Sequence, residues 1–347
     1  MVDGFGHGGI QQANLLLITE YIKIFGSVTL IVAKKNYSDL ELPESVKFKV
    51  IDLKSSKFID LKALYKLRKF FKINKPDFIL ANMYRSQIWS AALKTRSSKL
   101  IWVEQNTHFD RSVLKWFVMR IFSNRVNKIV CISDDVKKIT ISKLKKIGIT
   151  ITIPNPIRYI GTPRLSKRFD KDFIFVGRLV PQKNPELAIK SFAEFCKQYK
   201  ADSVLHIVGD GELLEELKQL AWRLNISEKC NFHGWLSNVD VQKLMSKCKT
   251  LISTSKFEGM ALVRLEALAQ GCCVISTESG GSRQYLRPEK NEGTFIVDPT
   301  PSSISQIMNL TLSERYWTEE LINKRINLTS ELNSVKIAKD LISFSGE

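Results

Sequence analysis

Residues 256–271, KFEGMALVRLEALAQG, hold two glutamates, Glu258 and Glu266, with seven residues between them. LISTS (251–255) before this stretch and CCVIST (272–277) after it are apolar and rich in residues that favour strands. The order of these segments predicts a strand, a loop, a helix and a second strand. Glu258 then lies in the loop and Glu266 on the helix, where an unpaired carboxylate in apolar surroundings would be costly.

The same alternation of apolar strands and helical segments runs through the whole chain. Segments of helical periodicity, such as 9–25, 60–73 and 212–224, separate most of the strands. We expect strands at 28–32, 46–51, 77–81, 99–103, 128–132, 150–153, 172–176, 203–208, 229–233, 250–254, 273–276 and 294–297. This order predicts an α/β protein whose parallel sheets are covered by helices on both faces.

The length of 347 residues suffices for two domains, each with a core of its own. Residues 1–165 carry 29 Lys and Arg against 12 Asp and Glu, a charge of +17, whereas the remainder carries +1. A surplus of this size indicates an anionic surface or partner for the first half. We expect an N-terminal domain at 1–160, a linker at 161–171, a C-terminal domain at 172–330 and a closing helix at 331–347.

Several classes of protein are disfavoured by composition. The longest apolar runs are too short to span a membrane, and no signal-peptide pattern opens the sequence. The six cysteines form no Cys-x-x-Cys pair, so neither a zinc site nor a disulfide framework is indicated. No nucleic-acid-binding motif is present. We therefore expect a reduced, cytosolic chain, and we expect no cofactor and no required metal.

The loops that follow predicted strands are where such folds bind ligands. GRLVPQKNP (177–185) places Arg178 and Lys183 five residues apart, a spacing that suits a diphosphate clamp or two solvated surface charges. The helix after Glu258 offers free N–H groups to a phosphate. DGFGHGGIQQ (3–12) is a second glycine-rich turn before a helix, and VEQNTH (103–108) brings His108 to the end of a strand.

Together these motifs resemble the large retaining GT-B glycosyltransferase family with the E-x7-E motif. The resemblance implies two Rossmann-like doubly wound domains that face each other across a cleft. It implies a nucleotide-diphosphate sugar, such as a UDP-sugar, as donor in the C-terminal domain and an acceptor in the N-terminal domain. It implies roles for Arg178 and Lys183 on the diphosphate, Glu258 on the donor sugar, Glu266 on the ribose and His108 near the sugar. It also implies that the donor contacts the backbone of Gly8, Gly9, Gly259, Met260, Ala261 and Leu262.

The resemblance implies retention of anomeric configuration, and the cationic clamp takes the part that a metal ion would otherwise play. Two features depart from the family pattern. Only Met1 and Val2 precede the first glycine loop, so we expect a truncated first strand or a start that lies upstream. In SGGSRQYL (279–286), Gln284 stands where a glutamate is common in the family. The fine detail of the sugar or nucleotide pocket is therefore not carried over from the family, whereas the class is.

The acceptor is predicted to be a glycan or a lipid-linked sugar of bacterial surface polysaccharide, such as lipopolysaccharide O-antigen or capsule. Residues 61–75 and 111–125 combine cations with aromatic residues at helical spacing. This pattern is typical of helices that lie on anionic membranes, and it also fits ordinary helices whose aromatic side chains face the core. Lys66, Lys69, Lys115, Trp116 and Arg120 are the candidates for a membrane or acceptor surface at the inner face of the cytoplasmic membrane. A sugar-nucleotide epimerase of the same architecture and a non-catalytic sugar-nucleotide-binding protein remain the alternatives.

Overall fold

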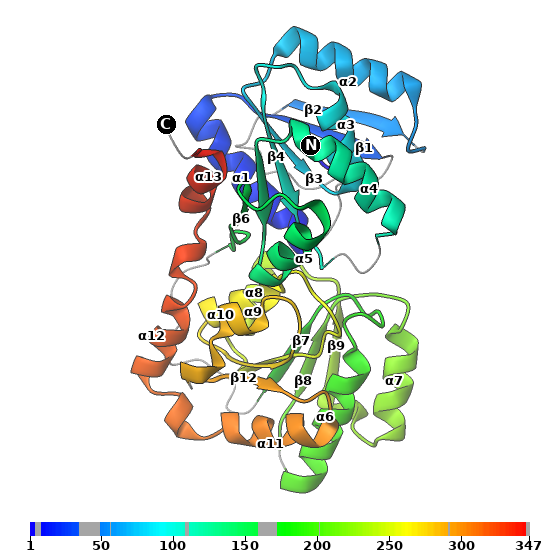
Figure 1. Ribbon diagram of the computed structural model, residues 1–347. Coiled ribbons are helices and arrows are strands. Elements are labelled where there is room, and N and C mark those ends of the chain that lie inside the picture. The colour runs from blue at the N-terminus through cyan, green and yellow to red at the C-terminus, as the bar shows by residue number, and fades with distance from the viewer. Residues whose placement is uncertain are drawn as a thin grey trace. The chain divides into compact units, whose positions relative to one another are not determined.

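A computed structural model describes residues 1–3, 8–34, 49–55, 57–107, 111–158, 172–200, 202–290 and 292–344 (Figure 1). The chain forms two compact units. Met1–Ile157 and Leu332–Glu347 make up the N-terminal unit, and Arg158–Glu331 make up the C-terminal unit. The predicted linker, 161–171, lies outside the described residues.

The N-terminal unit contains only parallel strand pairs among its described residues. β3 (Phe78–Asn82), β4 (Lys99–Glu104), β5 (Lys128–Cys131) and β6 (Thr150–Thr152) form one sheet in that order, and β1 (Thr29–Lys34) pairs with β2 (Lys49–Ser55). Met1 and Val2 connect the two sheets. The N–H of Val2 donates to Ile31 O at 2.9 Å, and the N–H of Asn82 donates to Met1 O at 2.9 Å.

Helices pack against the strands of this unit, and side-chain caps begin some of them. Asp60 accepts a hydrogen bond from the Ala63 N–H at 3.0 Å at the start of α2, and Ser133 caps α5 in the same way. α13 packs against α1, where Ser334 Oγ donates to Glu20 Oε1 at 3.2 Å. The helices of this unit are α1 (Gly9–Phe25), α2 (Leu61–Asn74), α3 (Tyr84–Leu93), α4 (Val113–Phe122), α5 (Asp134–Leu144) and α13 (Ser334–Ile342).

The C-terminal unit is built on six parallel strands in the order β12-β11-β10-β7-β8-β9. Counted from β7, this is the order 3-2-1-4-5-6 of dinucleotide-binding folds, and the strand order reverses between β7 and β10. The strands are β7 (Phe173–Val176), β8 (Leu205–Val208), β9 (Cys230–Gly234), β10 (Thr250–Ser253), β11 (Cys273–Thr277) and β12 (Thr294–Val297). The helices are α6 (Pro185–Tyr199), α7 (Leu214–Arg223), α8 (Asn238–Met245), α9 (Leu262–Ala269), α10 (Ser282–Leu286), α11 (Pro301–Thr311) and α12 (Glu319–Asn327).

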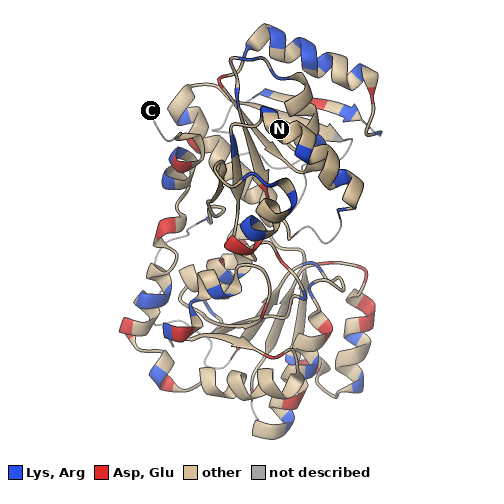
Figure 2. Ribbon diagram, viewed as in Figure 1, with Lys and Arg blue, Asp and Glu red and all other residues tan. Residues whose placement is uncertain are grey.

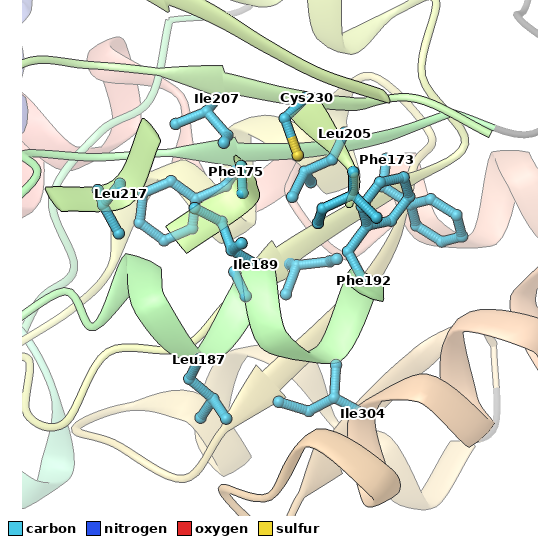
Figure 3. Close-up of a cluster of buried hydrophobic side chains, with 14 of the residues drawn as sticks. Phe173, Phe175, Leu187, Ile189, Phe192, Leu205, Ile207, Leu217, Cys230 and Ile304 are labelled. Carbon is cyan, nitrogen blue, oxygen red and sulfur yellow. The ribbon is translucent and has the colours of Figure 1, made fainter. Parts of the chain in front are cut away.

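A cluster of buried aromatic and aliphatic side chains fixes α6 on the sheet of the C-terminal unit (Figure 3). The rings of Phe173 on β7 and Phe195 on α6 lie 5.2 Å apart between centroids, in an edge-to-face arrangement. Phe192 on α6 and Ile304 on α11 belong to the same cluster. Because both β7 and α6 are anchored in this core, the loop that connects them is held at both ends.

Each predicted strand has a counterpart in the structure, and the helices predicted at 9–25, 60–73 and 212–224 correspond to α1, α2 and α7. The prediction of a doubly wound α/β fold is therefore confirmed. The predicted strand 46–51 is observed as Lys49–Ser55, and residues 46–48 lie outside the described part of the chain. Gln284, noted for its departure from the family pattern, lies on α10.

The loops after β7 and β8 run in direct backbone contact, which only a glycine allows. The N–H of Gly177 donates to Val208 O at 3.0 Å, and the N–H of Leu179 donates to Asp210 O at 2.9 Å. Gly209 between them has a φ of +134°, and a Cβ added there would lie 1.9 Å from Gly177 O. The close approach therefore leaves no room for a side chain at position 209.

We expect Gly209→Ala to lower the free energy of unfolding by about 3 kcal/mol or more, because a backbone segment must move. Gly234→Ala is the matched control in the same sheet: its φ is +65° and a Cβ would meet nothing within 4 Å. That variant should cost only about 1 kcal/mol. Urea unfolding monitored by circular dichroism measures both, and equal losses would contradict the role of the close contact.

Candidate active site

The strand order reverses between β7 and β10, and a crevice at the carboxyl ends of such strands is where this fold binds ligands. β7 and β10 are paired in parallel, with Phe173 opposite Thr250 and Ile174 opposite Leu251. Their loops, 177–184 and 254–261, therefore leave the sheet side by side. These are the two loops that carry Arg178, Lys183 and Glu258.

Hydrogen bonds join the two loops at several points. Thr254 Oγ1 donates to Asn184 O at 2.8 Å. The N–H of Lys256 donates to Gln182 O at 2.9 Å, and Gln182 Nε2 donates to Phe257 O at 3.1 Å. The loops thus form one connected structure, although the bonded residues are 70 or more positions apart in the chain.

Lys183 and Glu258 form an ion pair between Lys183 Nζ and Glu258 Oε1 across this junction. The side chain of Lys183 is 20% exposed and that of Glu258 is 9% exposed. Both groups are largely removed from water, so their attraction is screened less than that of a surface pair. Either group left alone would be an uncompensated charge in a poorly hydrated site.

α9 begins beside this pair without a side-chain cap. Its N-cap residue is Ala261, which offers no hydrogen-bonding side chain to the first N–H groups of the helix. Gly259 and Met260 precede it, and Leu262 is its first residue; all four are buried. An uncapped helix start of this kind attracts anions through its N–H groups and its dipole.

Arg264 lies between the two glutamates and was not singled out from the sequence. Its side chain is 2% exposed, and Nε donates to Ser253 Oγ at 3.0 Å while Nη2 donates to Ser279 Oγ. Nη1 is buried and has no hydrogen-bond partner in the described part of the chain. Burial lowers the pKa of this guanidinium to about 10, and the neighbouring Glu258 carboxylate opposes that shift. The sequence feature that could identify Arg264 is its place as a charged residue in an otherwise apolar helix segment.

Glu266 lies on α9 within a network of amides. Asn238 Nδ2 donates to Glu266 Oε1 at 3.1 Å, and Gln242 Nε2 donates to Asn238 Oδ1 at 3.1 Å. Burial raises the pKa of the Glu266 carboxyl group, whereas the hydrogen bond from Asn238 and the charge of Arg158 act in the opposite direction. Asn238 and Arg158 are thus further residues of the site that sequence patterns did not reveal.

Arg178 remains available at the edge of the site. It is exposed, and its Nη2 donates to Gln182 Oε1 at 3.3 Å within its own loop. The structure therefore pairs Lys183 directly with Glu258 and leaves Arg178 in the same loop, facing solvent.

The other predicted donor residues belong to the N-terminal unit. Gly8 is the N-cap of α1 and Gly9 is its first residue. His108 lies outside the described residues.

The predicted membrane or acceptor residues divide into two groups. Lys66 and Lys69 on α2 are exposed, as are Lys115 and Arg120 on α4. Trp116 was proposed as a surface residue, but its side chain is 7% exposed and packs into the unit under the Arg111 guanidinium, 5.1 Å from the ring centroid. That assignment is wrong because helical spacing alone does not tell which face of α4 is buried.

The chemistry of the site suits an anion beside hydroxyl groups. Lys183, Arg178 and the start of α9 offer positive charge and N–H donors, and Glu258 and Glu266 offer acceptors. Within the described residues, no group of three or more His, Cys, Asp or Glu side chains could hold a metal ion. No helix in the described part of the chain is long and apolar enough to cross a membrane.

Residues 164–328 match the family model described as glycosyl transferases group 1. One relative is the N-acetylgalactosamine-N,N'-diacetylbacillosaminyl-diphospho-undecaprenol 4-alpha-N-acetylgalactosaminyltransferase of Campylobacter jejuni. It is 31% identical over 175 residues, covering 50% of this chain and 46% of that protein. The match thus spans about half the length of that relative.

A second relative aligns over more of its length. The UDP-Gal:alpha-D-GlcNAc-diphosphoundecaprenol alpha-1,3-galactosyltransferase of Escherichia coli is 28% identical over 314 residues, covering 81% of this chain and 79% of that protein. Among solved structures, Anabaena HepE in complex with UDP superposes with a TM-score of 0.78 at 18% identity. The superposition covers 98% of this chain and 96% of that one.

The structural likeness confirms the GT-B fold that the motifs imply. The family match covers the loops of the candidate site, including both glutamates of the E-x7-E motif. The chain therefore has the GT-B fold, and its segment 164–328 matches the glycosyl transferases group 1 family.

Proposed function

We propose that this protein is a retaining glycosyltransferase that moves a hexosyl or N-acetylhexosaminyl group from a UDP-sugar to a glycan or lipid-linked acceptor. The observation that carries the proposal is the Lys183–Glu258 ion pair at the strand-order reversal, beside the uncapped start of α9. A cation and a carboxylate held together there match a donor that has a phosphate next to a sugar ring. The donors and acceptors in the relatives' names support the substrate classes.

In the proposed reaction, the bond between the anomeric carbon and the β-phosphate oxygen breaks. A bond from the acceptor hydroxyl oxygen forms on the same face, and the hydroxyl proton passes to the departing diphosphate. Negative charge grows on that diphosphate in the transition state. Lys183, Arg178 and the N–H groups of α9 would stabilise it, and fixed groups of this kind act most strongly where charge develops.

The two glutamates would bind neutral parts of the donor. Glu258 would accept hydrogen bonds from sugar hydroxyls, and Glu266 would accept them from the ribose, with Asn238 holding its carboxylate in place. Because Glu258 is already paired with Lys183, the donor must replace that ion pair by a phosphate contact and a sugar contact. His108, outside the described residues, and the glycine pair Gly8 and Gly9 keep the roles near the sugar and diphosphate that the family resemblance implies.

The proposed setting is the assembly of bacterial surface polysaccharide. Both relatives described above are named for acceptors attached to diphospho-undecaprenol or diphosphoundecaprenol. A lipopolysaccharide 1,6-galactosyltransferase of Salmonella typhimurium is a further relative, 22% identical over 266 residues, covering 75% of this chain and 73% of that protein. A lipid-linked acceptor would account for the positive charge of the N-terminal half.

Lys183→Ala should lower turnover of a UDP-sugar by about 10²–10³, because it removes a cation that stabilises the departing diphosphate. Lys190→Ala is the matched control. It removes an exposed lysine on α6 whose pair with Glu186 lies in solvent, and it should leave turnover within about twofold. Release of UDP measured with and without an undecaprenyl-diphosphate-linked sugar is the assay. Turnover like that of the wild type in a folded Lys183→Ala protein would refute the proposal.

We also propose that turnover needs no divalent metal ion, because Lys183, Arg178 and α9 supply the positive charge. The enzyme should therefore keep its rate after metal stripping and in excess chelator. Rates measured in EDTA, and again after Mg²⁺ or Mn²⁺ is restored, test this expectation. An absolute requirement for either ion would overturn it.

We propose that the N-terminal unit docks on the inner face of the cytoplasmic membrane through α4. Val113, Leu114, Phe117 and Ile121 are exposed along this helix, and Val113 and Phe117 are 86% and 61% exposed. Lys115 and Arg120 flank them. Figure 2 shows Lys and Arg along α2 and α4. Such a helix can insert its apolar side chains between lipids while its cations contact anionic headgroups.

Replacing both Phe117 and Ile121 by Gln should weaken binding to anionic vesicles about tenfold or more, because two apolar side chains no longer leave water. Ile147→Gln is the control, since this residue is 72% exposed in the same unit but lies outside α4. Cosedimentation with phosphatidylglycerol vesicles at low and high salt is the measurement. Equal binding to neutral vesicles, or no effect of the double substitution, would contradict docking through α4.

A further inference from the structure

A cavity of about 470 Å³ is lined by residues of the N-terminal unit. Its walls come from segments that follow β2, β3 and β4 and from the start of α4. The volume is in the range of small-molecule sites. Three cations, Arg85, Arg111 and Lys115, and two aromatic side chains, Phe58 and Tyr84, are among the residues that line it.

Arg85 is a buried cation of this cavity. Its side chain is on α3 and 7% exposed. Nη1 donates to Ser55 O at 3.1 Å and to Ser55 Oγ at 3.2 Å, so the guanidinium is held in one position. Nε is buried and has no hydrogen-bond partner among the described residues. The guanidinium charge is therefore fixed at the wall of the cavity, where it would face an anion.

Two more cations line the same cavity. Arg111 Nη2 lies 3.0 Å from Glu104 Oε2, and the buried Glu104 fixes the guanidinium at the wall. Lys115 is exposed, with its Nζ 5.8 Å from the ring centroid of Tyr84. The carboxylate among the lining residues, Asp3, is already engaged: its oxygens accept from the N–H groups of Arg85 and Ser86 and from Ser86 Oγ.

The charges therefore leave the cavity cationic. Glu104 balances Arg111, and the Asp3 carboxylate caps the start of α3. Arg85 and Lys115 are not paired with a carboxylate in any ion pair of the described residues. Two such cations within one cavity match the charge of a phosphate or diphosphate.

One wall is aromatic. The rings of Phe58 and Tyr84 are stacked, with centroids 5.3 Å apart. An apolar ring face of this kind suits the C–H face of a sugar. The cavity also has a polar lining residue, Gln105, whose amide is held in place by two hydrogen bonds. Its Nε2 donates to Asn82 Oδ1 at 3.1 Å, and its Oε1 accepts from Asn155 Nδ2 at 2.7 Å. The cavity thus combines cations, a ring surface and ordered amides.

We propose that this cavity binds the glycosyl diphosphate group of the acceptor, with Arg85 and Lys115 on the phosphates and the Phe58–Tyr84 wall on the sugar. The proposal rests on the proposed function, because it names the acceptor class of that transferase. Lys115 also belongs to α4, one residue from the buried Trp116 and two from the exposed Phe117. The lipid chain of such an acceptor would then leave the cavity toward the apolar face of α4.

The probe for a direct test is α-GlcNAc diphosphate carrying a short alkyl chain, titrated into the full chain by calorimetry. Octyl α-GlcNAc, which lacks phosphate, and inorganic diphosphate, which lacks sugar, form the other two arms. We expect the complete probe to bind at least about tenfold more tightly than either part, because cations and ring wall act together. No saturable binding of the probe, or equal binding of inorganic diphosphate, would overturn the assignment.

Variants locate the binding in the cavity. Lys115→Gln should weaken the probe about 10-fold, as expected for a lost charge-assisted hydrogen bond, and should leave octyl α-GlcNAc unchanged. Lys143→Gln is the matched control, an exposed lysine on α5 that does not line the cavity. Arg85→Lys keeps the charge but loses the guanidinium geometry and should weaken the probe less than Arg85→Gln does. Unchanged affinity in Lys115→Gln and Arg85→Gln would overturn the proposal.

A UDP titration separates this proposal from the proposed function. The wild type and Lys115→Gln should bind UDP alike, because the side chains of Arg178 and Lys183 that would bind its phosphates lie in the other unit. If the wild type bound no UDP, the transferase proposal would fail even with the probe bound in the cavity. If UDP bound normally and substitution of Arg85 or Lys115 left the affinity for the probe unchanged, the cavity assignment alone would fail.

Discussion

The candidate donor site depends on the parallel pairing of β7 with β10. These strands are neighbours in the sheet although 73 or more residues separate them in the chain, and the strand order reverses between them. Any loop that leaves β7 must therefore run beside the loop that leaves β10. The glycines at 177 and 209 and the aromatic core under α6 fix the first loop, and Thr254 and Gln182 join it to the second. Charged side chains on the two loops are brought together as a consequence.

The Lys183–Glu258 ion pair joins the two loops at this junction. In the free protein, each charge compensates the other in a largely buried place. In the proposed function, a sugar nucleotide would offer a phosphate to the lysine and hydroxyl groups to the glutamate, so donor binding would replace one internal pair by two contacts with the donor. Arg264, buried beneath with an unpaired Nη1, adds positive charge to the same region. The N-terminal unit has a similar buried arginine. Arg85 lies at a cavity wall, and its Nε has no hydrogen-bond partner among the described residues.

Sequence patterns predict the strands well because strands of a parallel sheet are buried on both faces and read as apolar runs. Lys183 and Glu258 were identifiable because ligand-binding loops follow such strands. Arg264, Asn238 and Arg85 were missed, since their importance arises from contacts that strand order creates and that spacing in the sequence does not encode. Trp116 was misplaced for a related reason: helical spacing predicts an amphipathic α4 but does not say whether Trp116 or Phe117 faces the core.

The central claim is that the donor's diphosphate takes Lys183 away from Glu258, and a calorimetric titration with UDP alone tests it most directly. UDP carries the phosphates but no sugar for Glu258. Lys183→Gln should weaken UDP about tenfold or more, because a charge-assisted hydrogen bond is lost. Glu258→Gln frees Lys183 from its partner, so UDP should bind at least as tightly as to the wild type, although sugar transfer falls. Equal weakening of UDP by both substitutions, or no effect of Lys183→Gln, would contradict the account.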